Sequence, residues 1–415
     1  MPADRATTAP SLAEIAREWG RIGCIGFGGP PAHVALLHDL CVDRRAWLTA
    51  AEFERAIGAT NLLPGPASTQ LAIYCAWRLR GTRGALLGGT CFVAPGLVLI
   101  LALSALFLAG SPPRWLRGAG MGAGAAVAAV ALRAGLTLAV PIWARTPPGE
   151  RPRVLLYALA GGLAAALTGP WLVLVLLGCG LAELGLRSLV RGAVGAHAWP
   201  ALLAALPAAR IARAASSAPV AQAISLSPAP ATAAAAPAGV GALVWTAFKV
   251  GALAFGGGFV IVPLMQGDAV GVYHWMTHTQ FLNAVALGQV TPGPVTQTVA
   301  AVGYAAAGLP GGLLAALVAF APSFSFILLG AARFERLLID ERVRAFLSGA
   351  VPAAAGAIIG AAIPLAGAIG ERWQYPILAA AAIALLSLRR GVVQTLLFAG
   401  AAGILAALLG APIPG

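Results

Sequence analysis

Hydrophobic residues in this chain gather into long runs that short polar loops separate. The runs long enough to cross a bilayer cover residues 84–108, 118–142, 154–189, 311–332, 343–369 and 391–409. A helix needs roughly 20 apolar residues to span the hydrocarbon core, and a helix satisfies its backbone hydrogen bonds within one segment. The pattern therefore predicts an all-α integral membrane protein with roughly 10–13 membrane segments.

The composition agrees with this class and excludes a water-soluble protein. Hydrophobic residues make up 59% of the 415 residues and charged residues 10%, whereas soluble domains carry roughly 25% charged residues. The first ten residues lack the apolar core of a cleavable signal peptide. The five cysteines are irregularly spaced and lie in or beside apolar stretches, which predicts neither a disulfide framework nor a metal site.

An internal repeat is the most informative feature of the sequence. When Arg21 is aligned with Lys249, residues 21–66 match residues 249–294 without a gap, and fourteen positions are identical. The register persists through Gly84, and a one-residue slip then brings Pro95 onto Pro322. Shared apolar composition does not explain these identities, because several are glycines and prolines with special backbone requirements. The chain is therefore interpreted as a fused duplication.

A segment rich in Ala, Pro and Ser separates the two halves. Such a composition without periodicity is typical of a flexible linker outside the membrane. We therefore expect an N-terminal transporter repeat at residues 11–213, a linker at 214–239 and a C-terminal transporter repeat at 240–411.

The charges of equivalent loops favour inverted repeats. Loops 41–55 and 78–83 carry six arginines, whereas their counterparts 269–283 and 306–311 carry no basic residue. Cytoplasmic loops are enriched in Lys and Arg, so an opposite bias at equivalent positions predicts opposite orientations. The approach to the linker does not fit this scheme, because it is also basic, at Arg187, Arg191, Arg210 and Arg213. Topology also accounts for most of the net charge of +13, and we expect a lipid bilayer and no nucleic acid as partner.

Two short motifs occur once in each half, inside apolar stretches. Gly26–Pro30 is matched by Ala254–Gly258, and Asn61–Pro66 is matched by Gln289–Pro294. Relative to Ala, Gly costs about 1 kcal/mol and Pro about 3 kcal/mol in a helix, so each motif should break a helix at membrane depth. Broken backbone at that depth is tolerated where it lines a cavity or is buried in protein. The helix that starts after a break presents free amides and a positive dipole end, which suit an anion.

Polar and basic residues accompany these breaks in matched pairs. Four polar pairs flank the Pro-Gly-Pro segments or follow them: Asn61 with Gln289, Ser68 with Thr296, Thr69 with Gln297, and Gln70 with Thr298. Arg21 and Lys249 are also equivalent, and Lys249 is the one lysine of the sequence. Both could bind substrate or extend to the membrane interface. The candidate substrate-binding residues are Arg21, Gly28, Gly29, Pro30, Asn61, Pro64, Gly65, Pro66, Ser68, Gln70, Lys249, Gly256, Gly257, Gln289, Pro292, Gly293, Pro294, Thr296 and Gln297.

Other classes of function find less support in the sequence. Carboxylates are scarce at membrane depth, which argues against a cation carrier. His33 and His38 have no counterpart in the second half, and a proton-coupling role is the weaker interpretation for them. We find no phosphate-binding loop, metal-ligand cluster or nucleophile–base pair, so we expect no catalytic residue, no cofactor and transport driven by a gradient. A membrane enzyme or a lipid-handling protein is the remote alternative.

With these residues identified, the chain resembles the chromate ion transporter family in its long, two-domain form. The resemblance rests on Gly26–Pro30, Arg44–Leu48, Leu63–Gln70 and the recurrences at 255–258 and 292–294. It implies a multi-pass carrier in a bacterial cytoplasmic membrane that exports chromate, with both glycine pairs and both Pro-Gly-Pro segments as functional positions. Sulfate or another tetrahedral anion, moved by uptake or exchange, remains an alternative substrate. A homodimer remains open.

Overall fold

The computed structural model describes residues 10–108, 112–167, 172–192, 239–254, 259–331 and 340–413, and these residues form helices and no strands. Five of the described helices are long and apolar enough to cross a membrane. Large apolar side chains on them face outward, among them Leu317 at 71% exposure and Leu329 at 76%. This pattern suits a lipid solvent, and the expectation of an all-α membrane protein is confirmed. The expected linker lies outside the described residues, except for Gly239.

The first half contains three short elements between longer helices. Its elements are α1 (Leu12–Ile25), α2 (Pro30–His38), η1 (Asp39–Arg44), α3 (Ala50–Leu62), α4 (Ala67–Phe107), α5 (Arg114–Arg145), α6 (Arg151–Leu167) and α7 (Leu172–Gly192). The apolar run 154–189 was expected as one stretch. The structure divides it, because α6 ends at Leu167 and α7 begins at Leu172.

The second half repeats this order. Its elements are α10 (Val240–Leu253), α11 (Ile261–Gln266), η5 (Gly267–Val272), α12 (His278–Val290), η6 (Val295–Gln297), α13 (Thr298–Gly330), α15 (Glu341–Gly367), α16 (Gln374–Ala382), η8 (Ile383–Ser387) and α17 (Val392–Leu408). The helical stretch 374–387 was missed in the sequence, because its apolar run is too short to meet the length of a membrane span.

The helix boundaries confirm the duplication. The alignment that places Arg21 on Lys249 also carries α1 onto α10 and α3 onto α12, with matching first and last residues. The helix starts are also equivalent, since Thr49 and Thr277 both cap their helices in capping boxes with Glu52 and Gln280. Local chemistry thus starts the same helix at the same place twice.

The one-residue slip between the halves lies earlier than the sequence alignment placed it. α4 kinks at Arg80 and Gly81, and α13 kinks in the same conformation at Ala307 and Gly308, one position earlier than a gap-free alignment would place the kink. The slip therefore precedes the kink. A Cβ on Gly65 would meet the amide of Gln70, and a Cβ on Gly293 would meet that of Gln297, so the slip also precedes these two glutamines. It follows that Gln70 corresponds to Gln297, and that the earlier pairing of Gln70 with Thr298 was wrong.

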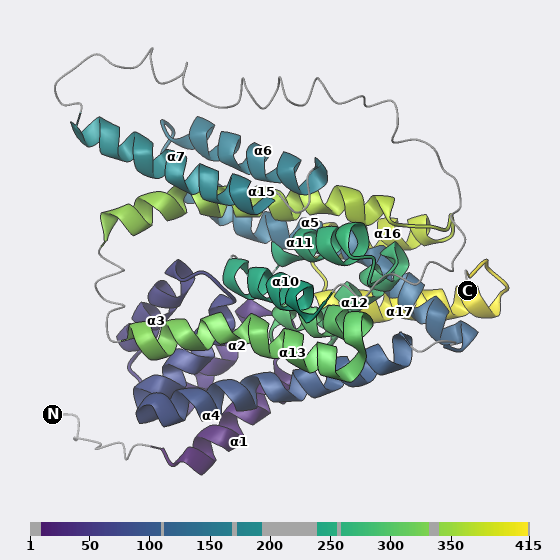
Figure 1. The fold of residues 1–415 in the computed structure, drawn as a ribbon, viewed down its shortest axis with the longest axis horizontal. Coiled ribbons are helices and arrows are strands. Elements are labelled where there is room, and N and C mark those ends of the chain that lie inside the picture. Colours follow the sequence, from purple (N-terminus) through teal and green to yellow (C-terminus); the bar gives the residue numbers. More distant parts are fainter. Residues whose placement is uncertain are drawn as a thin grey trace.

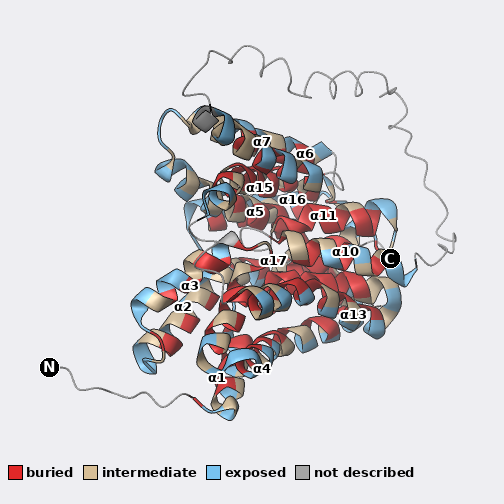
Figure 2. Cartoon of the chain, turned by 60° about the vertical axis from the view of Figure 1, so that its left-hand side comes forward, coloured by how far each residue is buried: buried red, intermediate tan, exposed pale blue. Residues whose placement is uncertain are grey.

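The helices of the two halves pack into one another rather than side by side as separate bodies. α5 lies against α16 and α17 of the second half, and α15 lies reciprocally against α6 and α7 of the first. In Figure 1, α6, α7 and α15 form one side of the molecule, and α1, α4 and α13 form the other. Figure 2 shows the buried residues concentrated in the middle, where core residues come from both halves.

Glycines allow the closest of these helix contacts. A Cβ on Gly356 of α15 would overlap the carbonyl oxygen of Ala158 on α6, and a Cβ on Gly161 would overlap that of Ala353. Small residues let helix backbones approach closely in a membrane, where association depends on van der Waals packing. The α6–α15 contact therefore depends on the absence of side chains at these positions.

Replacing Gly356 with leucine should destabilise the protein strongly. The added side chain has no space against α6, and overpacking costs about 1–3 kcal/mol or more. Thermal unfolding of detergent-purified protein measures this as a lower midpoint. The matched control is Gly178→Leu, since Gly178 is exposed and has no atom within 4 Å of a Cβ. Equal midpoints for the two variants would contradict the close α6–α15 contact.

Candidate functional site

Both kinds of motif break helices in the structure, as predicted. α1 ends at Ile25 before the Gly-Gly pair, and Gly28 and Gly29 adopt φ values of 100° and 73°. In the Pro-Gly-Pro segments, Gly65 and Gly293 have φ values of 119° and 97°. Residues with a Cβ rarely adopt this region, so glycine is required at these four positions. The counterparts of the first pair, Gly256 and Gly257, lie outside the described residues.

The prolines start the next helices in two ways. Pro30 is the first residue of α2, where the missing N–H of proline costs no hydrogen bond. Pro66 and Pro294 instead occupy the N-cap positions of α4 and η6. Each still precedes a helix start, where the first-turn amides have no intrahelical acceptor.

A chain of hydrogen bonds joins the two halves at their breaks. The Gly26 carbonyl accepts the backbone N–H of Gly293 at 3.0 Å, across the two halves. The same carbonyl lies 2.9 Å from His33 Nε2, and His33 Nδ1 lies 3.1 Å from Ser68 Oγ. The chain from Ser68 through His33 and Gly26 to Gly293 therefore connects the helix start after one Pro-Gly-Pro segment with the glycine of the other.

The same contacts define the hydrogen positions on His33. A carbonyl oxygen can only accept, so Nε2 carries the proton that is donated to Gly26. In the neutral ring, Nδ1 then accepts from the Ser68 hydroxyl. His33 is fully buried and stacks edge-on against Phe92. The contacts with Gly26, Ser68 and Phe92 therefore hold the His33 ring in place between the two helix breaks.

Each Pro-Gly-Pro segment also packs against the long helix of the other half. A Cβ on Gly65 would lie 3.3 Å from Ser323 Oγ of α13. Reciprocally, a Cβ on Gly96 of α4 would overlap the carbonyl oxygen of Pro292. Gly96 and Ser323 are equivalent in the register that the kinks of α4 and α13 establish. The two segments therefore occupy equivalent places at the interface between the halves.

Buried polar atoms without a partner concentrate at these two places. Within the described part of the chain, seven of the ten such side-chain atoms flank or contact a Pro-Gly-Pro segment: Thr69 Oγ1, Gln70 Oε1, Gln289 Nε2, Thr291 Oγ1, Thr296 Oγ1, Gln297 Oε1 and Ser323 Oγ. Leaving such a group unpaired costs about 1–3 kcal/mol. A cluster of them in a folded protein therefore requires a reason beyond stability.

The chemistry of these atoms suits a hydrated or protonated oxyanion. The four hydroxyls and the Gln289 amide nitrogen can donate to oxyanion oxygens. The two glutamine side chains offer acceptors instead. Gln70 Nε2 donates to the Pro64 carbonyl at 2.7 Å and Gln297 Nε2 donates to the Val93 carbonyl at 2.8 Å, so their Oε1 atoms are the atoms left without a partner. An amide oxygen can accept from a water molecule or from the hydroxyl of a singly protonated oxyanion.

The two places differ in their access to the surface. Gln289 is buried beside its Pro-Gly-Pro segment, and Pro292, Gly293 and Pro294 are buried with it. The equivalent Asn61 in the first half is exposed. The first-half segment is therefore the more accessible of the two.

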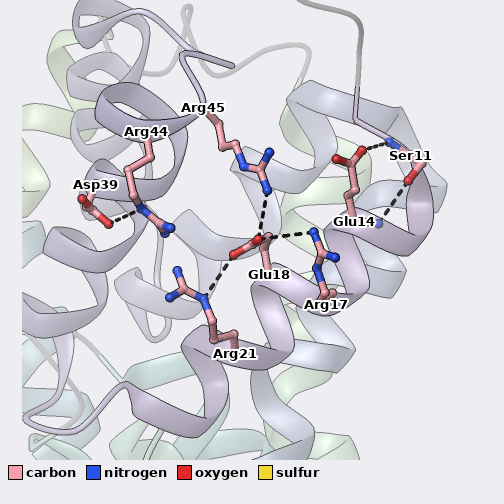
Figure 3. Close-up of polar contacts among 8 residues, drawn as sticks. All are labelled: Ser11, Glu14, Arg17, Glu18, Arg21, Asp39, Arg44 and Arg45. Atoms are coloured by element: carbon pink, nitrogen blue, oxygen red, sulfur yellow. Dashed lines mark hydrogen bonds and ion pairs between the residues drawn. The ribbon is translucent and has the colours of Figure 1, made fainter.

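Arg21 makes its contacts in the second half of α1 (Figure 3). Its Nε lies 3.2 Å from a Glu18 oxygen, and Glu18 also pairs with Arg45 at 3.3 Å and Arg17 at 3.7 Å. One buried carboxylate thus forms ion pairs with three arginines. These four side chains together carry a net charge of two positive units. The Arg21 side chain remains 44% exposed.

Lys249 has a carboxylate partner that the sequence did not reveal. Its Nζ lies 2.6 Å from Asp268 Oδ2, and Thr246 Oγ1 donates to the same oxygen at 2.9 Å. Thr246 is equivalent to Glu18. The carboxylate partner of the basic residue therefore lies on α1 in the first half and on η5 in the second. Asp268, Glu18 and Glu183 are all buried inside the protein.

The sequence does not identify His33, Gly96, Thr291 and Ser323 as residues of this site. His33 was set aside because it has no counterpart in the second half. Gly96 and Ser323 each follow one of the two matched prolines, Pro95 and Pro322, and that recurrence was the signal that could have identified them.

Known proteins that resemble this chain include chromate transport proteins, and the similarity extends over both halves. A family model described as "Chromate transporter" matches residues 13–184 and 241–407. The chain is 31% identical to the chromate transport protein of Cupriavidus metallidurans over 95% of this chain and 93% of that protein. It is 30% identical to the chromate transport protein of Pseudomonas aeruginosa over 87% and 83% of the two chains.

A probable chromate transport protein of Synechococcus elongatus is 29% identical over 86% of this chain and 85% of its own length. No solved structure matches the chain. The family model covers both halves, and the relatives match nearly end to end. The chain therefore belongs to the chromate transporter family.

Proposed function

We propose that this protein carries chromate across the cytoplasmic membrane of a bacterium, as a gradient-driven exporter and not as an enzyme. The observation that carries the proposal is the cluster of buried, unpaired donors at the two Pro-Gly-Pro segments. Chromate is a tetrahedral oxyanion with four acceptor oxygens, and hydroxyls, amides and helix-start N–H groups are the donors that it requires. Relatives that span most of the chain are named as chromate transport proteins.

The binding residues in this proposal are those that surround the two segments. Helix-start amides after Pro66 and Pro294 and the hydroxyls of Thr69, Thr296 and Ser323 would hold the anion. Arg21 and Lys249 each pair with a carboxylate, so their part would be a favourable potential around the site and not direct coordination. Sulfate has the same charge and shape as chromate, but nothing in the relatives' names favours it.

Transport in everted membrane vesicles tests the function. Vesicles that contain the protein should accumulate chromate in their lumen, which corresponds to export from the cell, and an uncoupler should abolish the accumulation. Vesicles without the protein are the control. If the vesicles accumulate sulfate and added chromate does not compete with it, chromate is not the substrate. If chromate accumulation persists in the presence of the uncoupler, transport is not driven by the gradient.

We infer further that the two halves are inverted in the membrane. The opposite arginine bias of equivalent loops and the reciprocal packing of α5 and α15 support this arrangement. Single cysteines at the exposed, equivalent positions Asp43 and Gly271, in a cysteine-free background, test it. A membrane-impermeant maleimide added to whole cells should label Gly271→Cys and spare Asp43→Cys. Equal labelling of both would show that the halves are parallel.

A further inference from the structure

A cavity of about 390 Å³ lies apart from the Pro-Gly-Pro segments, at the ends of four helices. Its walls include the last turn of α5 at Arg145, the first turns of α6 around Arg153 and of α15 at Arg344, and Glu183 and Arg187 of α7. Helices of these lengths end near the membrane surface. The cavity therefore opens where lipid headgroups lie.

A buried carboxylate organises one side of this cavity. Glu183 is 3% exposed and accepts from Tyr157 Oη at 3.0 Å and from Arg187 Nε at 2.8 Å. Arg153 lies 3.6 Å from the same carboxylate, and Glu150 pairs with both arginines at 3.4 and 3.5 Å. Two carboxylates thus balance two arginines, and the four side chains hold one another in place.

The lining also carries charge that no carboxylate balances. Arg145 and Arg344 also line the cavity, and neither forms an ion pair with any residue that the structure describes. The cavity therefore has four arginines against two glutamates, an excess of two positive charges. An Arg guanidinium binds phosphate oxygens in a bidentate geometry, so the two arginines without a carboxylate partner can hold the single negative charge of a phosphodiester.

Apolar side chains complete the wall. Ile142, Val154, Leu347 and Val351 line the cavity beside the arginines. A charged end and an apolar wall at the membrane surface suit a phospholipid, with the phosphate at the arginines and the start of an acyl chain on the wall. Basic pockets between membrane helices bind anionic headgroups in this way.

We propose that this cavity binds a phosphate group, and that its source is the headgroup of an anionic phospholipid. Arg145 belongs to the first half and Arg344 to the second, so the bound phosphate bridges the two halves at the membrane surface. A free phosphate ion shares the chemistry of the headgroup but gains nothing from the apolar wall.

Native mass spectrometry of the full-length, detergent-purified protein tests the proposal. The probes are phosphatidylglycerol, the zwitterionic phosphatidylethanolamine and inorganic phosphate. The wild type should bind one phosphatidylglycerol at saturation and bind phosphatidylethanolamine at least tenfold more weakly. The double variant Arg145→Gln/Arg344→Gln should bind phosphatidylglycerol at least tenfold more weakly than the wild type, because each basic residue near the membrane contributes about a fivefold gain in affinity.

The matched control is Arg55→Gln/Arg83→Gln, which removes two exposed arginines outside the cavity, and it should bind phosphatidylglycerol like the wild type. Binding of inorganic phosphate alone, lost in the Arg145/Arg344 variant, would support the phosphate site and overturn the lipid as its source. Equal binding of phosphatidylglycerol by all three proteins would overturn the site itself. Arg145 and Arg344 are both exposed, so their replacement should not unfold the protein. The thermal unfolding midpoint of each variant verifies that it is folded.

Discussion

Replacing Gly293 with alanine should reduce chromate transport at least tenfold while the protein still inserts and folds. Gly293 has a φ of 97°, which costs a residue with a Cβ about 1–2 kcal/mol. The added Cβ would also lie 3.1 Å from Gln297 Nε2 and disturb that side chain. The Gly293 N–H is bonded to the Gly26 carbonyl of the other half, so relaxation of the segment shifts the contact between the two breaks. Initial rates of chromate uptake in everted vesicles measure the effect.

The control for this prediction separates backbone strain from damage to the site. Gly308 also has a positive φ, of 63°, and its nearest neighbour to a Cβ, Pro310 Cδ, is 3.9 Å away. Gly308→Ala therefore carries a similar backbone cost at the kink of α13, away from the Pro-Gly-Pro segments. It should transport at close to the wild-type rate. If both variants lose transport equally, strain alone explains the loss, and the site is not at Gly293.

Replacing Ser323 with alanine should make the protein more stable and a poorer transporter. The hydroxyl is fully buried without a partner, and removal of such a group relieves a cost of about 1–3 kcal/mol. The same hydroxyl is a proposed donor to the anion, and a hydrogen bond to a charged group contributes about 1.5–3 kcal/mol. The apparent KM for chromate should therefore rise about tenfold or more, while the midpoint of thermal unfolding rises.

Ser104 provides the matched comparison. It lies on α4, two turns beyond Gly96, and its hydroxyl is likewise buried and unpaired. Ser104→Ala should therefore raise the unfolding midpoint and leave the KM unchanged. A Ser323→Ala variant with raised stability and an unchanged KM would show that this hydroxyl does not touch the substrate.

The features that the sequence predicted correctly depend on local chemistry. Helix breaks at Gly28, Gly29 and the two Pro-Gly-Pro segments follow from backbone preferences that act within a few residues. The helix starts at Thr49 and Thr277 follow from capping residues in the same turn. Duplication made each of these signals visible twice, which is why helices of both halves could be aligned before the structure.

The features that the sequence did not predict depend on contacts between distant residues. His33 matters because the fold brings Ser68 and Gly26 to its two ring nitrogens. Lys249 is paired because η5 presents Asp268 to it, and no spacing rule connects these two positions. The equivalence of Gln70 and Gln297 depends on a one-residue slip between the halves that precedes these residues. A gap-free alignment does not show this slip.

The roles of Arg21 and Lys249 show the same limit. Their equivalence in the two halves left two roles open, a contact with the anion or extension to the membrane interface. In the structure, Arg21 is paired with Glu18, and Lys249 is paired with Asp268. The sequence did not reveal these ion pairs, and the atoms that we propose to bind the anion are instead those that are buried without a partner.

The most direct test of the central claim is equilibrium binding of chromate to the purified protein by isothermal titration calorimetry. The wild type should bind chromate saturably. The double variant Thr69→Val/Thr296→Val keeps the shape of both side chains and removes one buried, unpaired hydroxyl from each Pro-Gly-Pro site. It should remain folded, with an unchanged or higher unfolding midpoint, and bind at least tenfold more weakly. Binding of chromate by this variant with wild-type affinity would contradict an oxyanion site at the Pro-Gly-Pro segments.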